Sequence, residues 1–197
     1  MALIVEDGTI VAGANAYCSA ATVASYFTDR QNAAWTGAAP IQEAAIIRAC
    51  AFLDARYRDR YPGYRVKGRN QAMEWPRIAA FTHVPDNGRS TGFMDTGYGI
   101  RAGYTDYGTG YDYIPPTQIP HEIVSAACEA ALRELVDPGS LAPDLERGGA
   151  IRLLKAGSVE IEYSSNAVPT TVFQMIDLAL VSLLLPRQMY SGRVSRG

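Results

Sequence analysis

Two histidines are the first candidates for acid–base chemistry, because imidazole has the ordinary side-chain pKa closest to neutral pH. His121 is followed directly by Glu122, and His83 stands two residues before Pro85. A Glu–His pair at the start of a predicted helix is more typical of a solvated helix terminus than of a general acid–base couple. The chain has no G-x-S-x-G, H-E-x-x-H or Walker A sequence. We therefore expect no catalytic residue and no enzymatic activity.

Thiols and carboxylates that could hold a metal ion are scattered along the chain. Cys18, Cys50 and Cys128 lie far apart and lack the C-x-x-C spacing of zinc sites. Cys50 and Cys128 fall in apolar stretches of helical spacing, which favours small core residues. Asp106 and Asp112 flank glycines but do not form the dense acidic pattern of a calcium loop. The sequence predicts neither a metal site nor a cofactor.

A basic and aromatic segment spans residues 56–69. Its cations and tyrosines are Arg56, Tyr57, Arg58, Arg60, Tyr61, Tyr64, Arg65, Lys67 and Arg69. Such a segment could follow a nucleic-acid backbone and stack on bases. Alternatively, the arginines could favour the negative end of a helix and pair with nearby acids, or they could contact a neighbouring subunit. We favour the two protein interpretations, with Arg56, Arg58 and Arg60 as candidate subunit contacts.

A glycine- and tyrosine-rich stretch occupies residues 78–116. Its candidate contact residues are Tyr98, Tyr104, Tyr107 and Tyr111. So many glycines lose much backbone entropy on folding, which predicts a long inserted loop. Tyrosine supplies contact area at low side-chain entropy, so we expect an adaptable contact surface for a subunit or tail protein. A loop with no partner is the alternative.

Composition places the chain among soluble globular proteins of one domain. It has 197 residues, 48% hydrophobic and 19% charged, and a net charge of −2. This balance does not supply the basic surface typical of a duplex-DNA binder. We recognise no signal peptide and no run long enough to span a membrane, so synthesis in the host cytoplasm is expected.

The elements that must position these residues are mainly helical. Apolar spacing and capping residues predict helices over 19–30, from Pro40 to before Pro62, over 120–137 and over about 171–185. Two β-prone runs, 151–154 and 159–163, predict a hairpin between the third and fourth helices. Residues 65–77 read as irregular. The predicted fold is a small bundle of about four helices over residues 1–186, with the hairpin, the long insert and a polar, basic tail at 187–197.

Three sequence blocks occur in a fixed order around these helices. They are Val5–Gly8 with Asn15–Tyr17 and Ser19; Leu53–Arg58 with Gly63, Gly68 and Glu74–Arg77; and Leu141–Gly149 with Val159–Tyr163. In that order they resemble a family of tailed-phage proteins labelled "DnaT-like", which are similar to head-to-tail connector adaptors. The resemblance runs from Leu3 to about Leu185 and fails over the insert.

The resemblance implies a structural virion protein located at the neck between head and tail. About twelve copies would form a ring beneath the portal protein and join it to the tail or a stopper component, while genomic DNA passes without being read. By analogy, the C-terminal tail would dock to the portal. Its proposed contact residues are Arg187, Met189, Tyr190, Arg193 and Arg196. The alternative is a single-stranded DNA-binding replication accessory protein that uses residues 56–69.

Overall fold

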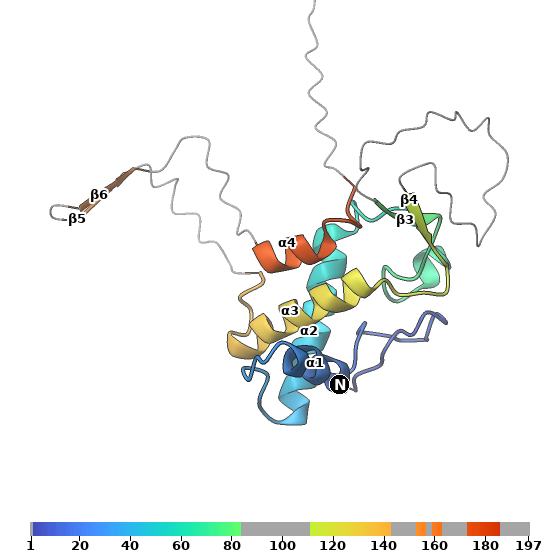
Figure 1. Cartoon of the computed structure of the whole chain (residues 1–197), viewed down its shortest axis with the longest axis horizontal. Helices are drawn as coiled ribbons and strands as arrows, with labels where there is room; N and C mark the ends of the chain where they lie inside the picture. The colour runs from blue at the N-terminus through green and yellow to red at the C-terminus, as the bar shows by residue number, and fades with distance from the viewer. Residues whose placement is uncertain (1, 84–110, 143–152, 157–158, 163–172, 186–197) are drawn as a thin grey trace, which may run out of the picture.

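The computed structural model describes residues 2–83, 111–142, 153–156, 159–162 and 173–185 (Figure 1). Four helices form the body: α1 (Ala20–Asp29), α2 (Ala39–Tyr57), α3 (His121–Val136) and α4 (Gln174–Leu180). Helix α3 packs between α2 and α4, and α1 lies against both α2 and α3. None of the described helices is long and apolar enough to cross a membrane.

The first two helices begin where the sequence predicts. Ser19 has extended backbone, and its hydroxyl oxygen accepts a hydrogen bond from the Thr22 N–H at 3.1 Å, which caps α1. Pro40 lies in the first turn of α2, where its missing N–H costs nothing. One stripe of α2 is buried at helical spacing: Ala45, Ile46, Ala49, Cys50, Leu53 and Tyr57. These helices therefore follow from local sequence signals and an apolar face.

The fourth helix is shorter than the predicted span of about 171–185. Residues 171–172 lie outside the described residues, and α4 gives way to turns after Leu180. The Leu185 N–H donates to the Arg60 carbonyl at 2.8 Å instead of continuing the helical ladder. Pro186 follows and disfavours helical backbone at Leu185. A hydrogen bond to the segment that follows α2 thus takes the place of the last helical turn that the sequence predicted.

Small antiparallel sheets accompany the helices. Strands β5 (Leu153–Ala156) and β6 (Val159–Glu162) pair from Leu153–Glu162 to Ala156–Val159, which confirms the hairpin between α3 and α4. Two further strand pairs were not predicted. Strand β1 (Tyr64–Arg65) pairs with β2 (Arg77–Ile78), and η1 (Gly68–Asn70) is a short 3-10 helix between them. The prediction of irregular chain over 65–77 is therefore wrong at both ends, and the fold is a mixed one rather than a pure bundle.

The predicted insert is also more structured at its ends than expected. Strand β3 (Ala80–His83) pairs with β4 (Tyr111–Ile114) across the insert. The span 78–116 therefore includes a four-residue ladder, because backbone hydrogen bonds can close a loop that has little to bury. Tyr111 lies in this ladder opposite His83. Residues 84–110, including Tyr98, Tyr104 and Tyr107, lie outside the described residues.

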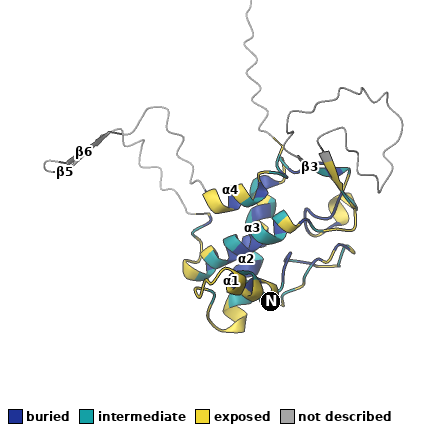
Figure 2. Ribbon diagram, viewed as in Figure 1, coloured by how far each residue is buried: buried dark blue, intermediate teal, exposed yellow. Residues whose placement is uncertain are grey.

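A single core lies between the helices and the segment that contains Trp75 (Figure 2). Its largest fully buried aromatic side chains are Trp75, Tyr57 and Phe27. Trp35 packs against this core and stacks on Phe27 with ring centroids 6.2 Å apart, which fixes the loop between α1 and α2. All three cysteines are buried, as predicted for Cys50 and Cys128.

Candidate functional site

The buried carboxylate of Glu74 lies close to three arginines. All three belong to the second sequence block or to the segment within it. Its Oε2 lies 2.9 Å from Nη1 of Arg77, and both side chains are buried. Its Oε1 lies 3.5 Å from Nη2 of Arg58 and 3.8 Å from Nη1 of Arg65. Glu74 therefore pairs with arginines that the sequence alone leaves available for DNA, and its one charge balances one of the three.

Arg77 uses its remaining donors on the backbone. Its Nε donates to the Pro62 carbonyl at 2.8 Å, and its Nη2 donates to the Gly63 carbonyl at 2.7 Å. Gly63 has a φ of 70°, and a Cβ there would lie 2.1 Å from the Ile78 carbonyl oxygen. A glycine is required at this close approach. Arg77 thus fastens the chain after α2 to strand β2.

A second polar group joins the first sequence block to the second. The Tyr17 hydroxyl donates to Oδ1 of Asp54 and accepts the Trp75 N–H at 3.2 Å. Oδ2 of Asp54 accepts the Glu74 N–H at 3.0 Å. Burial raises the pKa of Asp54 to about 6, although these hydrogen bonds oppose the shift. Burial, with Asp54 nearby, also raises the pKa of Tyr17 well above its ordinary value.

The third block begins with a comparable arrangement. The Glu134 carboxylate is buried, accepts the N–H groups of Gly139 and Leu141, and lies 2.7 Å from Nε of Arg48. These hydrogen bonds and Arg48 keep the pKa of Glu134 below its usual value, although burial opposes them. Residues 143–149 of this block lie outside the described residues. The described parts of all three blocks hold the fold together.

The predicted subunit-contact arginines also touch their own chain. The Arg56 guanidinium lies 5.0 Å from the ring centroid of Phe173, and Nε of Arg60 donates to the Leu185 carbonyl at 3.1 Å. Arg58 pairs with Glu74 but leaves 62% of its side chain exposed. These interactions agree with the interpretation in which the arginines cover the end of α2.

An apolar surface on α4 and the end of α3 is the clearest candidate contact site. Met175, Leu178 and Val181 of the α4 region leave 62%, 57% and 67% of their surface exposed, and Val136 of α3 leaves 70%. We call these four residues the α4 face. Sequence reasoning named only the buried stripe of this helix. The spacing 175, 178 and 181 repeats every three residues and could have indicated a second apolar face.

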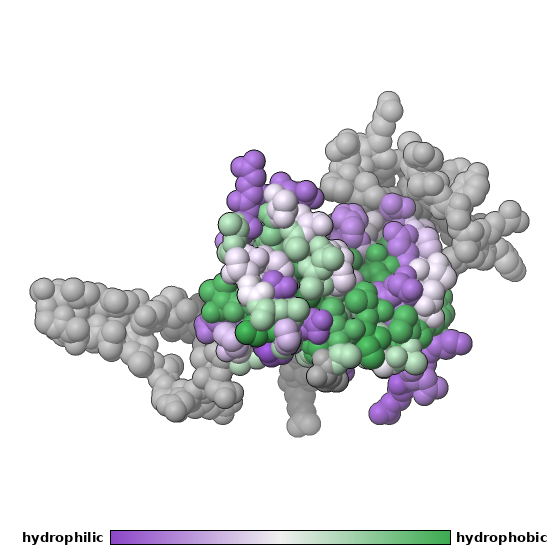
Figure 3. Space-filling view, turned by 90° about the horizontal axis from the view of Figure 1, so that it is seen from below, coloured by the Kyte–Doolittle hydropathy of each residue, from purple (hydrophilic) through white to green (hydrophobic). Residues whose placement is uncertain are grey.

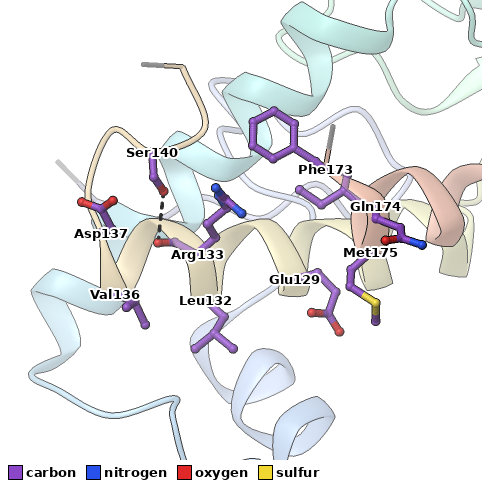
Figure 4. Close-up of a pocket in the computed structure, with 10 residues that line it drawn as sticks. Glu129, Leu132, Arg133, Val136, Asp137, Ser140, Phe173, Gln174 and Met175 are labelled. Carbon is purple, nitrogen blue, oxygen red and sulfur yellow. Dashed lines mark hydrogen bonds between the residues drawn. The ribbon is translucent and has the colours of Figure 1, made fainter. Parts of the chain in front are cut away.

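A groove lies between α3 and α4, and two residues of the α4 face, Val136 and Met175, are part of its lining (Figure 4). Phe173 forms one wall, and the guanidinium of Arg133 lies 4.9 Å from its ring centroid. In Figure 4, Val136, Leu132 and Met175 point to the other side of α3, away from Phe173. The groove has apolar walls with a few polar groups, namely Glu129, Asp137, Ser140 and Gln174. Such a lining suits contact with a protein segment.

Apolar side chains are also exposed away from the α4 face. Ile4 is 37% exposed, and Ile41, in the first turn of α2, is 56% exposed. Figure 1 draws the start of α2 at the bottom of the body and α4 at the top. Seen from below, the described surface carries broad hydrophobic areas broken by hydrophilic groups (Figure 3). Apolar surface is therefore exposed on more than one side of the molecule.

Within the described residues, the histidine and the possible metal ligands considered above do not come together as a site. Nδ1 of His121 lies 3.3 Å from Oε2 of Glu122, and the His121 side chain is 88% exposed, as expected of a helix start. Among the described residues, no cluster of three or more His, Cys, Asp or Glu side chains could hold a metal ion. The proposed portal-contact residues 187–196 lie outside the described part of the chain.

Comparison with models of known protein families shows which family the chain belongs to. Residues 1–87 and 105–197 match the family described as "Putative DnaT-like ssDNA binding protein". The protein belongs to this DnaT-like family. The DnaT-like match omits residues 88–104, which lie within the insert where the resemblance was expected to fail. No curated protein and no solved structure matches the chain.

Proposed function

We propose that this DnaT-like protein is a head-to-tail connector adaptor of a tailed phage. It forms a ring of about twelve copies beneath the portal protein and joins the portal to the tail or a stopper component. It acts at the neck of the virion after synthesis in the host cytoplasm, and it has no catalytic role and no cofactor. The observation that carries the proposal is the α4 face, because a soluble chain rarely exposes clustered large apolar side chains without a protein partner.

The distribution of apolar surface supports a ring rather than a symmetric dimer. The α4 face lies at one end of the body, and the exposed Ile41 lies in the first turn of α2, which Figure 1 draws at the other end. A contact between two different surfaces is heterologous, and repeated rotation closes such contacts into a ring. A neighbouring copy could therefore bury both surfaces at once.

The state of the arginines supports a conduit that lets DNA pass. Arg58, Arg65 and Arg77 lie around Glu74, and Arg60 binds the Leu185 carbonyl. The net charge of the chain is −2. Strong binding to a nucleic-acid backbone needs several available cations, and Arg77, which is buried against Glu74, is not one of them.

The portal contact is assigned to the C-terminal tail. The last described residue, Leu185, is held by its backbone to Arg60. The proposed contacts are Arg187, Met189, Tyr190, Arg193 and Arg196. Tyr98, Tyr104, Tyr107 and Tyr111 remain the proposed contacts to a neighbouring subunit or the tail.

Binding to purified portal rings tests this assignment. The full chain should co-purify with the portal, and a chain that lacks residues 189–197 should not. Because the deletion begins beyond the described body, its thermal unfolding should match that of the full chain. Portal binding that survives the deletion would contradict the assignment of the tail, and no binding by the full chain would contradict the connector proposal.

The second candidate function is binding of single-stranded DNA, which the family description favours. Tyr64 is 75% exposed and stands near Lys67 and Arg69, which are also exposed. An exposed aromatic ring beside cations can stack on a base and contact phosphate. This function requires salt-sensitive oligonucleotide binding that weakens in Tyr64→Ala and Lys67→Ala. Oligonucleotide binding below detection at low salt would exclude it.

A further inference from the structure

The register of the hairpin β5–β6 gives it one apolar and one polar face. Its pairs run from Leu153–Glu162 to Ala156–Val159. Opposed residues of an antiparallel pair share a face, and neighbours along a strand alternate between the two faces. One face therefore holds only apolar positions: Leu154, Ala156, Val159 and Ile161. The other face holds Leu153 and all three charged positions of the two strands: Lys155, Glu160 and Glu162.

The hairpin lacks a packing surface in the single chain. Among the described residues, the two strands contact mainly each other, and Figure 1 draws them apart from the four helices. A two-stranded ribbon is at best marginally stable in water unless a further surface packs against it. Burial of its apolar face would supply the missing stabilisation. The hairpin therefore needs a partner surface that is apolar and exposed.

The α4 face is such a surface. Its four residues leave between 57% and 70% of their area exposed, although the hairpin belongs to the same chain. The acid of α4, Asp177, is directed to α2, because its Oδ1 accepts the Tyr57 hydroxyl at 2.7 Å. The α4 face and the apolar face of the hairpin are thus alike in chemistry, and each is left uncovered in the single chain.

We propose that the apolar face of the hairpin β5–β6 docks on the α4 face of a neighbouring copy of this chain. The inference rests on the proposed ring and names the segment that covers the α4 face within it. A contact between a hairpin and a helix is heterologous, so it can repeat from copy to copy around a ring. Docking within one chain is disfavoured, because the α4 face stays exposed when the chain is alone.

The chain is long enough for this exchange. Ten residues, 143–152, precede the hairpin, and ten more, 163–172, lead to Phe173 at the start of α4. Ten residues can span at most about 33–36 Å, whereas the seven residues of α4 measure only about 10 Å. A hairpin joined by segments of this length can reach past its own body to the next copy.

A charge placed on the hairpin tests the contact. Ile161→Glu puts a carboxylate on the apolar face, so portal rings should lose most of the copies that they bind from the natural chain. Leu153→Glu is the matched control, because it makes a similar change on the polar face and should leave the copy number unchanged. Mass photometry of portal complexes counts the copies. Equal occupancy for Ile161→Glu and Leu153→Glu would overturn the proposal.

Crosslinking distinguishes a neighbouring copy from the same chain. One chain carries Ala156→Cys and a second carries Val181→Cys, while the three native cysteines are buried and react more slowly. The two chains are mixed, assembled on purified portal rings and treated with a short bis-maleimide. The expected product is a dimer joined between positions 156 and 181. Ala55→Cys, at an exposed position on α2, replaces Val181→Cys in the control and should give no dimer.

The other outcomes separate this contact from the connector function. A crosslink that forms only when one chain carries both substitutions would place the hairpin on its own α4 face and overturn the proposal. Chains that assemble on the portal without a dimer between 156 and 181 would also overturn it and leave the connector function standing. Chains that do not bind the portal would contradict the connector function and, with it, the ring on which this contact depends.

Discussion

Nη1 of Arg77 lies 2.9 Å from Oε2 of Glu74, and both side chains are buried. The same guanidinium binds the carbonyls of Pro62 and Gly63. One ion pair therefore organises the chain between the end of α2 and strand β2. The Glu-Trp-Pro-Arg sequence, which is part of the second sequence block, has a structural role here.

Replacing Arg77 with alanine should destabilise the protein strongly. The change leaves the buried Glu74 without its nearest cation and two carbonyls without their donor, which costs about 3–5 kcal/mol of unfolding free energy. Arg77→Lys should recover only part of this, because lysine lacks the planar fork of donors. Urea unfolding measures the unfolding free energy of both variants. The matched control is Arg58→Ala, whose exposed pair with Glu74 should be worth less than about 1 kcal/mol. Equal losses for Arg77→Ala and Arg58→Ala would contradict this account.

Asp54 should make stability fall as pH rises. Burial raises its pKa from 3.8 to about 6 in the fold. The folded state therefore binds the proton more tightly than the unfolded state, so the stabilisation is complete below about pH 4 and is lost as pH rises through about 6. The loss should not exceed about 3 kcal/mol.

The Asp54→Asn variant isolates this contribution. Asparagine does not titrate, so the difference in unfolding free energy between the natural chain and the variant should change between pH 4 and pH 6 and then level off. Urea titrations at several pH values give this difference. A difference that stays flat over that range would show that the carboxyl titrates with an ordinary pKa.

Removal of the Glu134 side chain should loosen the turn after α3. Glu134→Ala leaves the N–H groups of Gly139 and Leu141 without acceptors and Arg48 without its partner, which should cost about 2–4 kcal/mol. Glu134→Gln keeps one oxygen for these donors and should cost less. Hydrogen exchange should report faster exchange at Gly139 and Leu141 in the alanine variant. Unchanged exchange at both amides would be inconsistent with the role assigned to Glu134.

Charges placed on the α4 face should block assembly and leave the fold intact. Leu178→Glu and Val181→Glu put a carboxylate where the proposed ring buries apolar surface, so fewer copies should bind each portal. Because both side chains are exposed, the thermal midpoint should shift by less than about 2 °C. Mass photometry of portal complexes counts the copies. Ala55→Glu, at an exposed position on α2, is the control, and full occupancy in all three variants would remove the α4 face from the assembly.

Local signals in the sequence were sufficient for the helices. Ser19, Pro40 and the buried stripe of α2 follow known capping and periodicity rules. The hairpin β5–β6 was also predicted, because two β-prone runs flank a short turn. The end of α4 was not predicted, because it depends on a hydrogen bond between Arg60 and Leu185, which are 125 positions apart in the sequence.

The polar interior was harder to predict. The sequence predicted that Glu74 could pair with arginines of the basic segment, and its ion pairs with Arg58 and Arg65 agree with this. The burial of Glu74 against Arg77 and the bond of Asp54 to Tyr17 arise only in the folded chain. The pairing of β1 with β2 and of β3 with β4 depends on contacts across loops. The spacing of apolar residues along the sequence does not reveal such contacts.

Quantitative mass spectrometry of purified phage particles tests the central claim most directly. The amount of this chain is compared with that of the portal protein in the same particles. The connector account predicts about one copy for each portal subunit. Absence of the chain from the particle would contradict it and favour the DNA-binding alternative.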